Sequence, residues 1–401
     1  MEVRIGDSIE CNPTVKLVKG NEYPLIDIDK ITVGRKLVTN KDTIVYEKQS
    51  GCKFQNGDTL MARITPCLEN GKMAMASIPD KGIGSTELFV FRGKKGITDN
   101  DFVYYFLKQS YIRNLAANSM TGASGRQRAD LKFIKKIKFD LPTLPIQQKI
   151  ASTLSAYDRL IENNTRRIRL LEQMAENLYK EWFVRFRFPG HEKVEMENGL
   201  PKGWRAIHIK ELAQLKSGYA FKSEWFIEEG EAVAKIKDIG NILMDTSSFS
   251  YVDKENCIKA KKFLLTTGDL TIALTGATIG KISIVPKHKG NIYTNQRLGK
   301  FFLGDKPMEK LPFLYCLFKQ ESMVSNIVNL SNSSSAQPNI SPEQIEKIKI
   351  LGNHDIISMY NKTCNPLFSN ILALYSQNQL LTRQRDLLLP RLMSGKLEVK
   401  S

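Results

Sequence analysis

The sequence of 401 residues has few of the spacings on which metal and catalytic centres depend. Its six cysteines are scattered, form no Cys-x-x-Cys pair and have no histidine at metal-ligand spacing. Neither a zinc site nor a disulfide framework is therefore expected, and the cysteines are predicted to be reduced thiols. The four histidines form no His-Glu-x-x-His motif or triad, and the acidic residues form no nuclease cluster with a nearby lysine. We therefore expect no metal and no catalytic residues.

Long hydrophobic runs are also missing. No window approaches the roughly 18 apolar residues that a membrane-spanning helix needs. The N-terminus lacks the basic start and apolar stretch of a secretion signal. These two absences predict a soluble, cytoplasmic protein without a membrane partner.

Two segments approach known motifs without completing them. Gly276 to Lys281 resembles a phosphate-binding loop, but three residues separate its glycines where the Walker pattern has four. Asn365 to Phe368 resembles the catalytic tetrapeptide of amino-group DNA methyltransferases, but it lacks the second proline. No glycine-rich cofactor loop follows a strand. The chain is therefore expected to bind no cofactor and to be non-catalytic by itself.

Positive charge, by contrast, is abundant. Lysine and arginine number 59 against 42 aspartates and glutamates, which gives a formal net charge of +17. An excess of this size favours a polyanionic partner. An ordinary basic surface is the alternative, so the placement of the charges must decide between them.

One unit is present twice in the sequence. Three segments recur at a displacement of 211 positions, namely Gly57–Ala62 as Gly268–Ala273, Phe102–Gln109 as Phe313–Gln320, and Ile134–Phe139 as Ile345–Ile350. Each copy opens with short β-rich runs between turns, such as Tyr23–Ile31 and Glu87–Phe91 in the first. The aromatic block at 102–116 has helical spacing, and 134–141 alternates like a strand. Two mixed α/β modules are therefore predicted.

Each copy ends in a heptad pattern, with apolar residues at alternating steps of four and three. The two patterns are related by a shift of 210 positions. Over four heptads favour helix packed on helix, rather than an amphipathic helix packed on its own module. A pseudo-twofold relation would make the two helices antiparallel. The expected seam residues are Leu154, Ile161, Asn164, Ile168, Leu171, Ile371, Leu374, Asn378, Leu381 and Leu388.

One register of this helix pair places Asn164 opposite Asn378, so that the two buried amides satisfy each other. Pro366 is expected to weaken the early part of the second helix. A helix over 145–183 would span roughly 58 Å at about 1.5 Å per residue. Since one turn of DNA is about 34 Å long, the pair would hold two DNA-binding modules more than a turn apart.

The strongest basic concentration is the loop Gly122–Arg128, followed by Lys132, Lys135, Lys136 and Lys138. Arginine can recognise guanine and glutamine adenine, whereas serine and lysine hold phosphates. The matching segment Ser333–Asn339 keeps serine and glutamine but has no arginine, so the two copies are predicted to recognise different sequences. A solvated loop with incidental charge is the alternative.

Two further polar features extend this set. The cluster Tyr293–Arg297 could reach base edges, or its Asn and Gln could cap a turn. The turns ending in Lys72 and Lys281 could present a lysine to a phosphate, or simply reverse the chain. The candidate DNA-binding residues are Arg63, Lys72, Ser124, Arg126, Gln127, Arg128, Thr275, Lys281, Asn295, Gln296, Arg297, Ser335, Gln337 and Asn339.

The ordered set of motifs resembles the specificity (S) subunits of type I restriction-modification systems. The resemblance covers nearly the whole chain and rests on Pro201–Trp204, Gly268–Asp269, Thr294–Gln296, Ser335–Ser341, Leu144–Ile150 and Leu389–Leu397. Each motif alone is weak, but their order within a duplicated frame is specific. The start, Met1–Gly6, lacks the Pro-x-Gly-Trp opening seen at Pro201, so the first domain is expected to begin slightly truncated.

This resemblance implies an α+β fold with two α/β target-recognition domains, residues 1–143 and 186–352, joined by antiparallel coiled-coil helices at 144–185 and 353–401. Each domain would recognise one half of a bipartite DNA site, and the helices would set the spacer. The implied partners are double-stranded DNA, two methyltransferase (M) subunits and restriction (R) subunits. S-adenosylmethionine, ATP and magnesium would be bound by those subunits and not by this chain.

Two other classes remain open. The chain could be a stand-alone coiled-coil DNA-binding regulator without enzyme partners, or a self-contained restriction or methyltransferase enzyme. The incomplete tetrapeptide and the missing cofactor loop argue against the enzyme.

Overall fold

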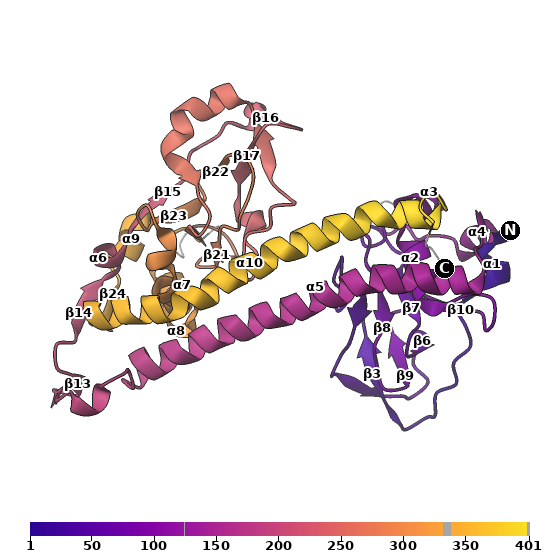
Figure 1. Cartoon of the computed structure of the whole chain (residues 1–401), viewed down its shortest axis with the longest axis horizontal. Helices are drawn as coiled ribbons and strands as arrows, with labels where there is room; N and C mark the ends of the chain where they lie inside the picture. The colour runs from indigo at the N-terminus through magenta and orange to yellow at the C-terminus, as the bar shows by residue number, and fades with distance from the viewer. Residues whose placement is uncertain (124, 332–337, 399–401) are drawn as a thin grey trace. The chain divides into compact units, whose positions relative to one another are not determined.

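A computed structural model describes residues 1–123, 125–331 and 338–398. The chain forms two compact units, of which the second is Asn164–Gln377 and the first contains the residues before and after it. Each unit holds one copy of the repeated module and one half of each long helix, α5 (Leu144–Tyr179) and α10 (His354–Met393). Figure 1 shows both helices as continuous ribbons, α5 in magenta and α10 in yellow. The boundary between the units therefore crosses both helices.

The first unit contains two larger sheets. One has the spatial order β2 (Ile9–Cys11), β10 (Leu88–Gly93), β7 (Thr59–Ala62), β8 (Met73–Ala76) and β4 (Leu37–Val38). The other has the order β5 (Thr43–Val45), β3 (Glu22–Ile26), β9 (Lys81–Gly84) and β6 (Cys52–Gln55). Every residue of β7 and β8 is buried, as expected for strands that are covered on both faces.

Short helices accompany these sheets in the described part of the first unit. They are α1 (Ile5–Ser8), α2 (Asn100–Lys108), α3 (Ser110–Asn118) and α4 (Leu131–Lys136). Helix α2 begins where the Asp99 carboxylate accepts a hydrogen bond from the amide of Phe102, which satisfies one of the free donors of the first turn. The aromatic block is thus helical as predicted, but Gln109 divides it into two helices.

The strand expected over 134–141 is wrong in its first part. Asp130 caps a helix there by accepting a hydrogen bond from the amide of Lys132, and α4 continues to Lys136. The strand, β11 (Lys138–Asp140), follows and pairs with β1 (Glu2–Arg4). Because the alternation covers only a few residues, a local cap decides the structure.

The second unit repeats this plan. Its first sheet has the order β15 (Gln214–Ser217), β23 (Leu298–Phe302), β20 (Leu270–Ala273) and β21 (Ile282–Ile284). Its second has β16 (Phe226–Ile227), β18 (Ser250–Val252), β17 (Glu231–Ala234), β22 (Ile292–Thr294) and β19 (Leu264–Leu265). Two small ladders pair β14 (Arg205–His208) with β24 (Lys349–Gly352), and β12 (Met196–Glu197) with β13 (Leu200–Pro201).

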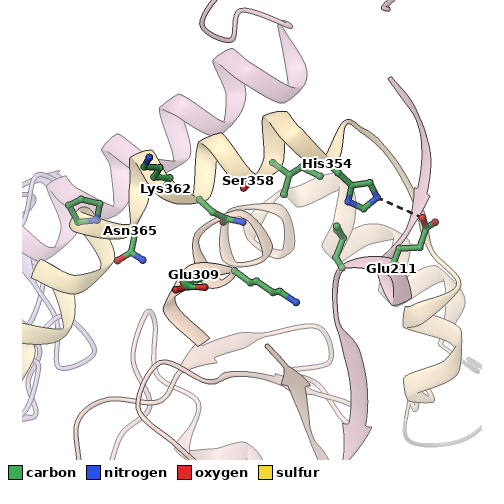
Figure 2. A pocket seen from close by; sticks show the side chains of 11 residues that line it. Glu211, Glu309, His354, Ser358, Lys362 and Asn365 are labelled. Carbon is green, nitrogen blue, oxygen red and sulfur yellow. Dashed lines mark ion pairs between the residues drawn. The ribbon is translucent and has the colours of Figure 1, made fainter. Parts of the chain in front are cut away.

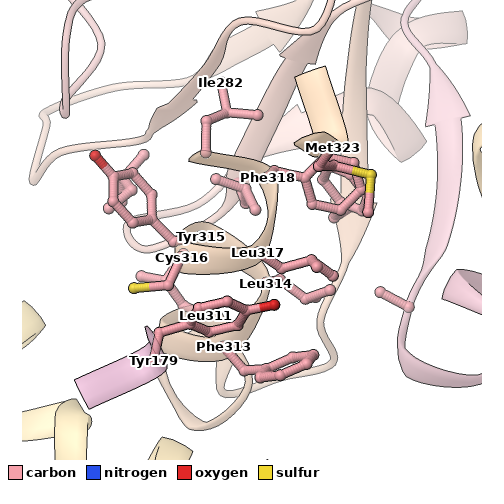
Figure 3. Packing of buried hydrophobic residues seen from close by; sticks show 14 of the residues in the cluster. Tyr179, Ile282, Leu311, Phe313, Leu314, Tyr315, Cys316, Leu317, Phe318 and Met323 are labelled. Atoms are coloured by element: carbon pink, nitrogen blue, oxygen red, sulfur yellow. The ribbon is translucent and has the colours of Figure 1, made fainter. Parts of the chain in front are cut away.

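The helices of the second unit also match the first copy. They are α6 (Ile209–Leu212), α7 (Leu311–Lys319), α8 (Glu321–Leu330) and α9 (Pro342–Glu346). Helix α7 occupies the place of α2, and all its residues from Leu311 to Phe318 are buried. Figure 3 shows the side chains of Leu311 and of Phe313 to Phe318 together with Ile282 of β21 and Tyr179 from the end of α5. The aromatic repeat is therefore the helix that joins the sheet to the long helices.

The long helices are antiparallel within each unit. In the first unit, the side-chain amide of Asn378 donates to the backbone carbonyl of Ile161 at 3.3 Å, and Arg385 pairs with Asp158. In the second, the Tyr360 hydroxyl donates to the carbonyl of Ala175 at 2.7 Å. Residue numbers therefore rise along α5 as they fall along α10. These contacts between α5 and α10 confirm the helix-on-helix prediction. The predicted seam residues are all buried or half-buried.

Two details of the helix pair differ from expectation or extend it. Asn164 donates to the side-chain oxygen of Gln377 at 3.0 Å, next in sequence to its expected partner Asn378, so the bond between the two asparagines stays a prediction. Helix α10 passes through Pro366 without a break, contrary to the expected weakening. The buried ring of Phe368 packs 5.3 Å from Tyr315 just beyond the proline, and this packing holds the turn in place. No helix in the described part of the chain has the length and apolarity to span a membrane.

Candidate nucleic-acid interface

Three chain segments of the first unit meet where β7 ends. The amide of Arg63 donates to the carbonyl of Glu87 at 3.0 Å, and the amide of Ala129 donates to the carbonyl of Arg63 at 2.8 Å. The amide of Thr65 donates to the carbonyl of Gln127 at 3.0 Å. The basic loop identified in the sequence is thus fastened by backbone hydrogen bonds beside the ends of β7 and β10.

The second unit builds the same junction from equivalent residues. The amide of Leu274 donates to the carbonyl of Arg297 at 3.0 Å, and the amide of Ile340 donates to the carbonyl of Leu274 at 3.0 Å. A bridge joins Thr275 to Asn339. The structure therefore brings together three of the predicted site residues that are far apart in the sequence, Thr275, Arg297 and Asn339.

The charges at the two junctions differ. The residue before the strand is Glu87 in the first unit and Arg297 in the second. The loop residue at the junction is Arg128, which bridges to Ile64, or Asn339, which bridges to Thr275. Nε and Nη2 of Arg128 donate to the Glu87 carboxylate at 2.6 to 3.1 Å. This hydrogen-bonded guanidinium holds the pKa of Glu87 below its usual value. The two junctions therefore share a backbone and present different functional groups.

The first junction borders a basic hollow of about 600 Å³. Its lining includes Arg63, Arg128, Lys132 and Lys135, with Asp130 as a counter-charge. The Arg63 guanidinium lies 4.8 Å from the ring centre of Phe89. Its Nε is buried and makes no hydrogen bond to any residue that the structure describes. A concave surface with several cations and a donor without an acceptor suits a phosphate or a base edge.

The two lysines at the turns have a structural role. Nζ of Lys72 donates to the carbonyl of Ile28 at 2.9 Å, and Nζ of Lys281 donates to the carbonyl of Ile239 at 3.2 Å. The contact is the same in both copies. This favours lysines that hold a neighbouring loop over lysines that point to a phosphate, the two roles that the sequence left open.

The remaining candidates divide by exposure. Asn295 is buried and its Oδ1 accepts a hydrogen bond from the amide of Arg297 at 3.3 Å, so it stabilises the turn. Gln296, Arg297 and Arg126 are exposed, and Gln127 is half-buried. Ser124, Ser335 and Gln337 lie outside the described residues.

Sequence analysis missed Glu87. Its signal was available, because a shift of 210 positions aligns it with Arg297, which was among the candidates. A carboxylate beside a candidate DNA-binding arginine is informative, because it would have to be displaced or tolerated if a phosphate approached. Glu87 therefore belongs to the candidate interface.

A second hollow, of about 710 Å³, lies in the second unit at the start of α10. Figure 2 shows that acidic and basic side chains alternate around it, with His354 Nε2 3.8 Å from the Glu211 carboxylate. Asn365, from the methyltransferase-like tetrapeptide, donates to the backbone carbonyl of Met308 at 3.2 Å. This contact gives the tetrapeptide a structural role. Within the described ranges, no cluster of His, Cys, Asp or Glu side chains could hold a metal ion.

Comparison with known proteins decides the family. The family model described as "Type I restriction modification DNA specificity domain" matches residues 2–173 and 201–351. The chain belongs to this family of DNA specificity subunits. The two matched ranges correspond to the two copies of the module, so the resemblance inferred from the motifs is confirmed.

Individual relatives agree with this assignment. The MjaVIII specificity subunit of Methanocaldococcus jannaschii is 29% identical over 364 residues, which cover 87% of this chain and 81% of that protein. The HindI specificity subunit of Haemophilus influenzae is 24% identical over 414 residues, covering 86% and 87%. The crystal structure of a type I S subunit from M. genitalium aligns over 98% of this chain and 96% of its own, with a TM-score of 0.54 and 16% identity. The latter likeness shows a common fold.

Proposed function

We propose that this specificity subunit recognises a bipartite double-stranded DNA target, with residues 1–143 binding one half and residues 186–352 the other. The observation that carries the proposal is the repeated junction at the strand ends. Both units use the same backbone hydrogen bonds there, yet Glu87 and Arg128 in one are replaced by Arg297 and Asn339 in the other. A common frame with different base-contacting groups suits two different half-sites.

The long helices are proposed to set the spacer between the half-sites and to bind two M subunits, to which R subunits add. Apolar side chains on their outer faces support such docking. In the first unit, Leu160, Leu380 and Leu387 are 50%, 62% and 57% exposed, and in the second, Leu170 and Met174 are 50% and 52% exposed. S-adenosylmethionine, ATP and magnesium would be bound by the partner subunits. This chain would be non-catalytic by itself and would be located in the cytoplasm. Isolation of the chain without any methyltransferase subunit would favour the stand-alone regulator instead.

Domain exchange tests this function. Replacing residues 1–143 by the corresponding domain of a relative should change one half of the target and leave the other half and the spacer unchanged. Methylated adenines mapped across the host genome would give both half-sites in one measurement. The reciprocal exchange of residues 186–352 is the matched control and should change the other half only. If the methylated positions stay the same after both exchanges, the two modules do not recognise DNA.

The ion pair at the first junction gives a second test. Arg128→Ala should weaken DNA binding by about 1–3 kcal/mol if this arginine contacts a base. Glu87→Gln should strengthen binding, since it removes a negative charge facing the phosphates and releases Arg128. Both effects are measurable as dissociation constants over a salt series. Lys95→Ala, which removes an exposed positive charge from the turn after β10, controls for net charge. Equal affinities for Arg128→Ala and Lys95→Ala would mean that the loop contributes only incidental positive charge and does not recognise DNA.

A further inference from the structure

The first unit contains a pocket of about 430 Å³ whose lining shares no residue with the basic hollow at the first junction. Its walls come from β7, β8, the α2–α3 corner and the last turns of α10. The apolar part includes Leu68, Leu107 and Leu389, and four cations, Lys72, Lys108, Arg113 and Arg385, face it with one carboxylate, Asp386. A pocket with an apolar wall and an excess of cations suits an anion on an apolar group.

The ammonium group of Lys108 is the unexplained feature of this pocket. It is buried, and no residue in the described part of the chain accepts a hydrogen bond from it. The Tyr104 ring lies 5.6 Å away. Arg385 already pairs with Asp158 and Asp386. Burial, with a smaller contribution from Arg385, lowers the pKa of Lys108 to about 8. Leaving such a donor without a partner is costly, so a partner is expected.

The duplication identifies the kind of partner that fits. Lys319 in the second unit occupies the place of Lys108, and Tyr315 occupies that of Tyr104, both at the displacement of 211. Each lysine lies over its tyrosine ring, at 5.8 Å in the second unit. There the site is filled, because Lys319 pairs with the Glu172 carboxylate at 3.2 Å and the Tyr315 hydroxyl donates to the same carboxylate.

The first unit lacks this carboxylate. Glu172 lies on α5, and the heptad shift of 210 positions places Thr382 of α10 at the equivalent point. Thr382 lines the pocket beside Lys108. The chain thus keeps the lysine and the tyrosine of the site but has a short hydroxyl where the second copy has an acid.

We propose that this pocket is a binding site for a carboxylate carried on an apolar group, which takes the place of Glu172 beside Lys108. The carboxylate can come from a small organic acid or from an acidic side chain of a bound protein. The second source rests on the proposed docking of M subunits to the long helices, whereas the first requires no partner.

Two matched variants test the site in the full-length chain. Thr382→Glu supplies the carboxylate internally, and Thr382→Gln adds the same length without charge. Binding of hexanoate, measured by saturation-transfer NMR near pH 7, should be retained by Thr382→Gln and weakened at least about tenfold by Thr382→Glu and by Lys108→Met. Hexanol, the neutral analogue, should bind no better to the wild type than to Lys108→Met. Thr382→Glu should also melt at a higher temperature than Thr382→Gln, because Lys108 gains a partner.

The source of the carboxylate follows from a second measurement, the affinity of each variant for the M subunit. Weaker assembly with Thr382→Glu, but not with Thr382→Gln, would assign the site to an acidic residue of the partner. Equal assembly together with hexanoate binding would assign it to a small acid. Equal hexanoate binding and equal melting of the two Thr382 variants would overturn the site itself, and would leave DNA recognition by the modules untouched.

Discussion

Replacing Asp158 by alanine is expected to lower the free energy of unfolding of the first unit by about 3–5 kcal/mol. Arg385 reaches the Asp158 carboxylate from α10, and the Tyr105 hydroxyl donates to it from α2. The side chains of Arg385 and Asp158 are only 3% and 7% exposed. Without the Asp158 carboxylate, the buried Arg385 guanidinium keeps only the half-exposed Asp386 as a partner, and the three helices lose the group that joins them. Amide hydrogen exchange in α2 and in the first half of α5 would measure the loss locally.

Two controls separate this ion pair from helix propensity. Glu162→Ala changes an exposed acid on the same helix and should alter stability by no more than about 0.5 kcal/mol. The double variant Asp158→Leu with Arg385→Met removes both buried charges, and should recover much of the lost stability because no buried charge is left without a partner. A loss for Asp158→Ala no larger than that for Glu162→Ala would mean that the pair does not hold the helices together.

The large features of the fold could be predicted because they are repeated or periodic. A heptad pattern records one packing surface over many turns, so the helices and their buried seam follow from the spacing alone. The antiparallel direction followed from the duplication. The ionic contact at Arg385 did not. Arg385 continues the steps of four and three between Leu381 and Leu388, but no local pattern links it to Asp158, which lies 227 positions away.

The candidate interface was predictable only in part for the same reason. The sequence identified Arg128 by its basic loop, but its partner Glu87 lies 41 residues away and on another segment. Similarly, Asn295 has a residue type suited to base recognition, and only its burial shows that it stabilises a turn. Residue type indicates which groups a side chain can bind, whereas its contacts with segments distant in the sequence decide whether it is free to bind them.

The repeated Gly-Asp pair, which served as a family motif, has a physical role that gives the second large effect. Gly57 has a φ of +83°, and the fully buried Asp58 accepts hydrogen bonds from the amide of Gln55 at 2.8 Å and from Nε and Nη2 of Arg92 at 2.7 Å. The aspartate thus closes the turn before β7 and neutralises an arginine on β10.

Asp58→Ala is therefore expected to lower the free energy of unfolding of the first unit by about 3–5 kcal/mol, since it leaves the mostly buried guanidinium of Arg92 without its main partner. Asp58→Asn should lose less, because its side-chain oxygen can still accept from the Gln55 amide. Hydrogen exchange of β7 and β10 would report both values.

The duplication supplies a matched experiment, because Asp269 pairs with Lys300 at 2.6 Å in the second unit, and Asp269→Ala should loosen β20 and β23 there. The exposed control Asp80→Ala is expected to leave the exchange protection of β7 and β10 unchanged. If Asp58→Ala also leaves it unchanged, the motif does not stabilise the sheet.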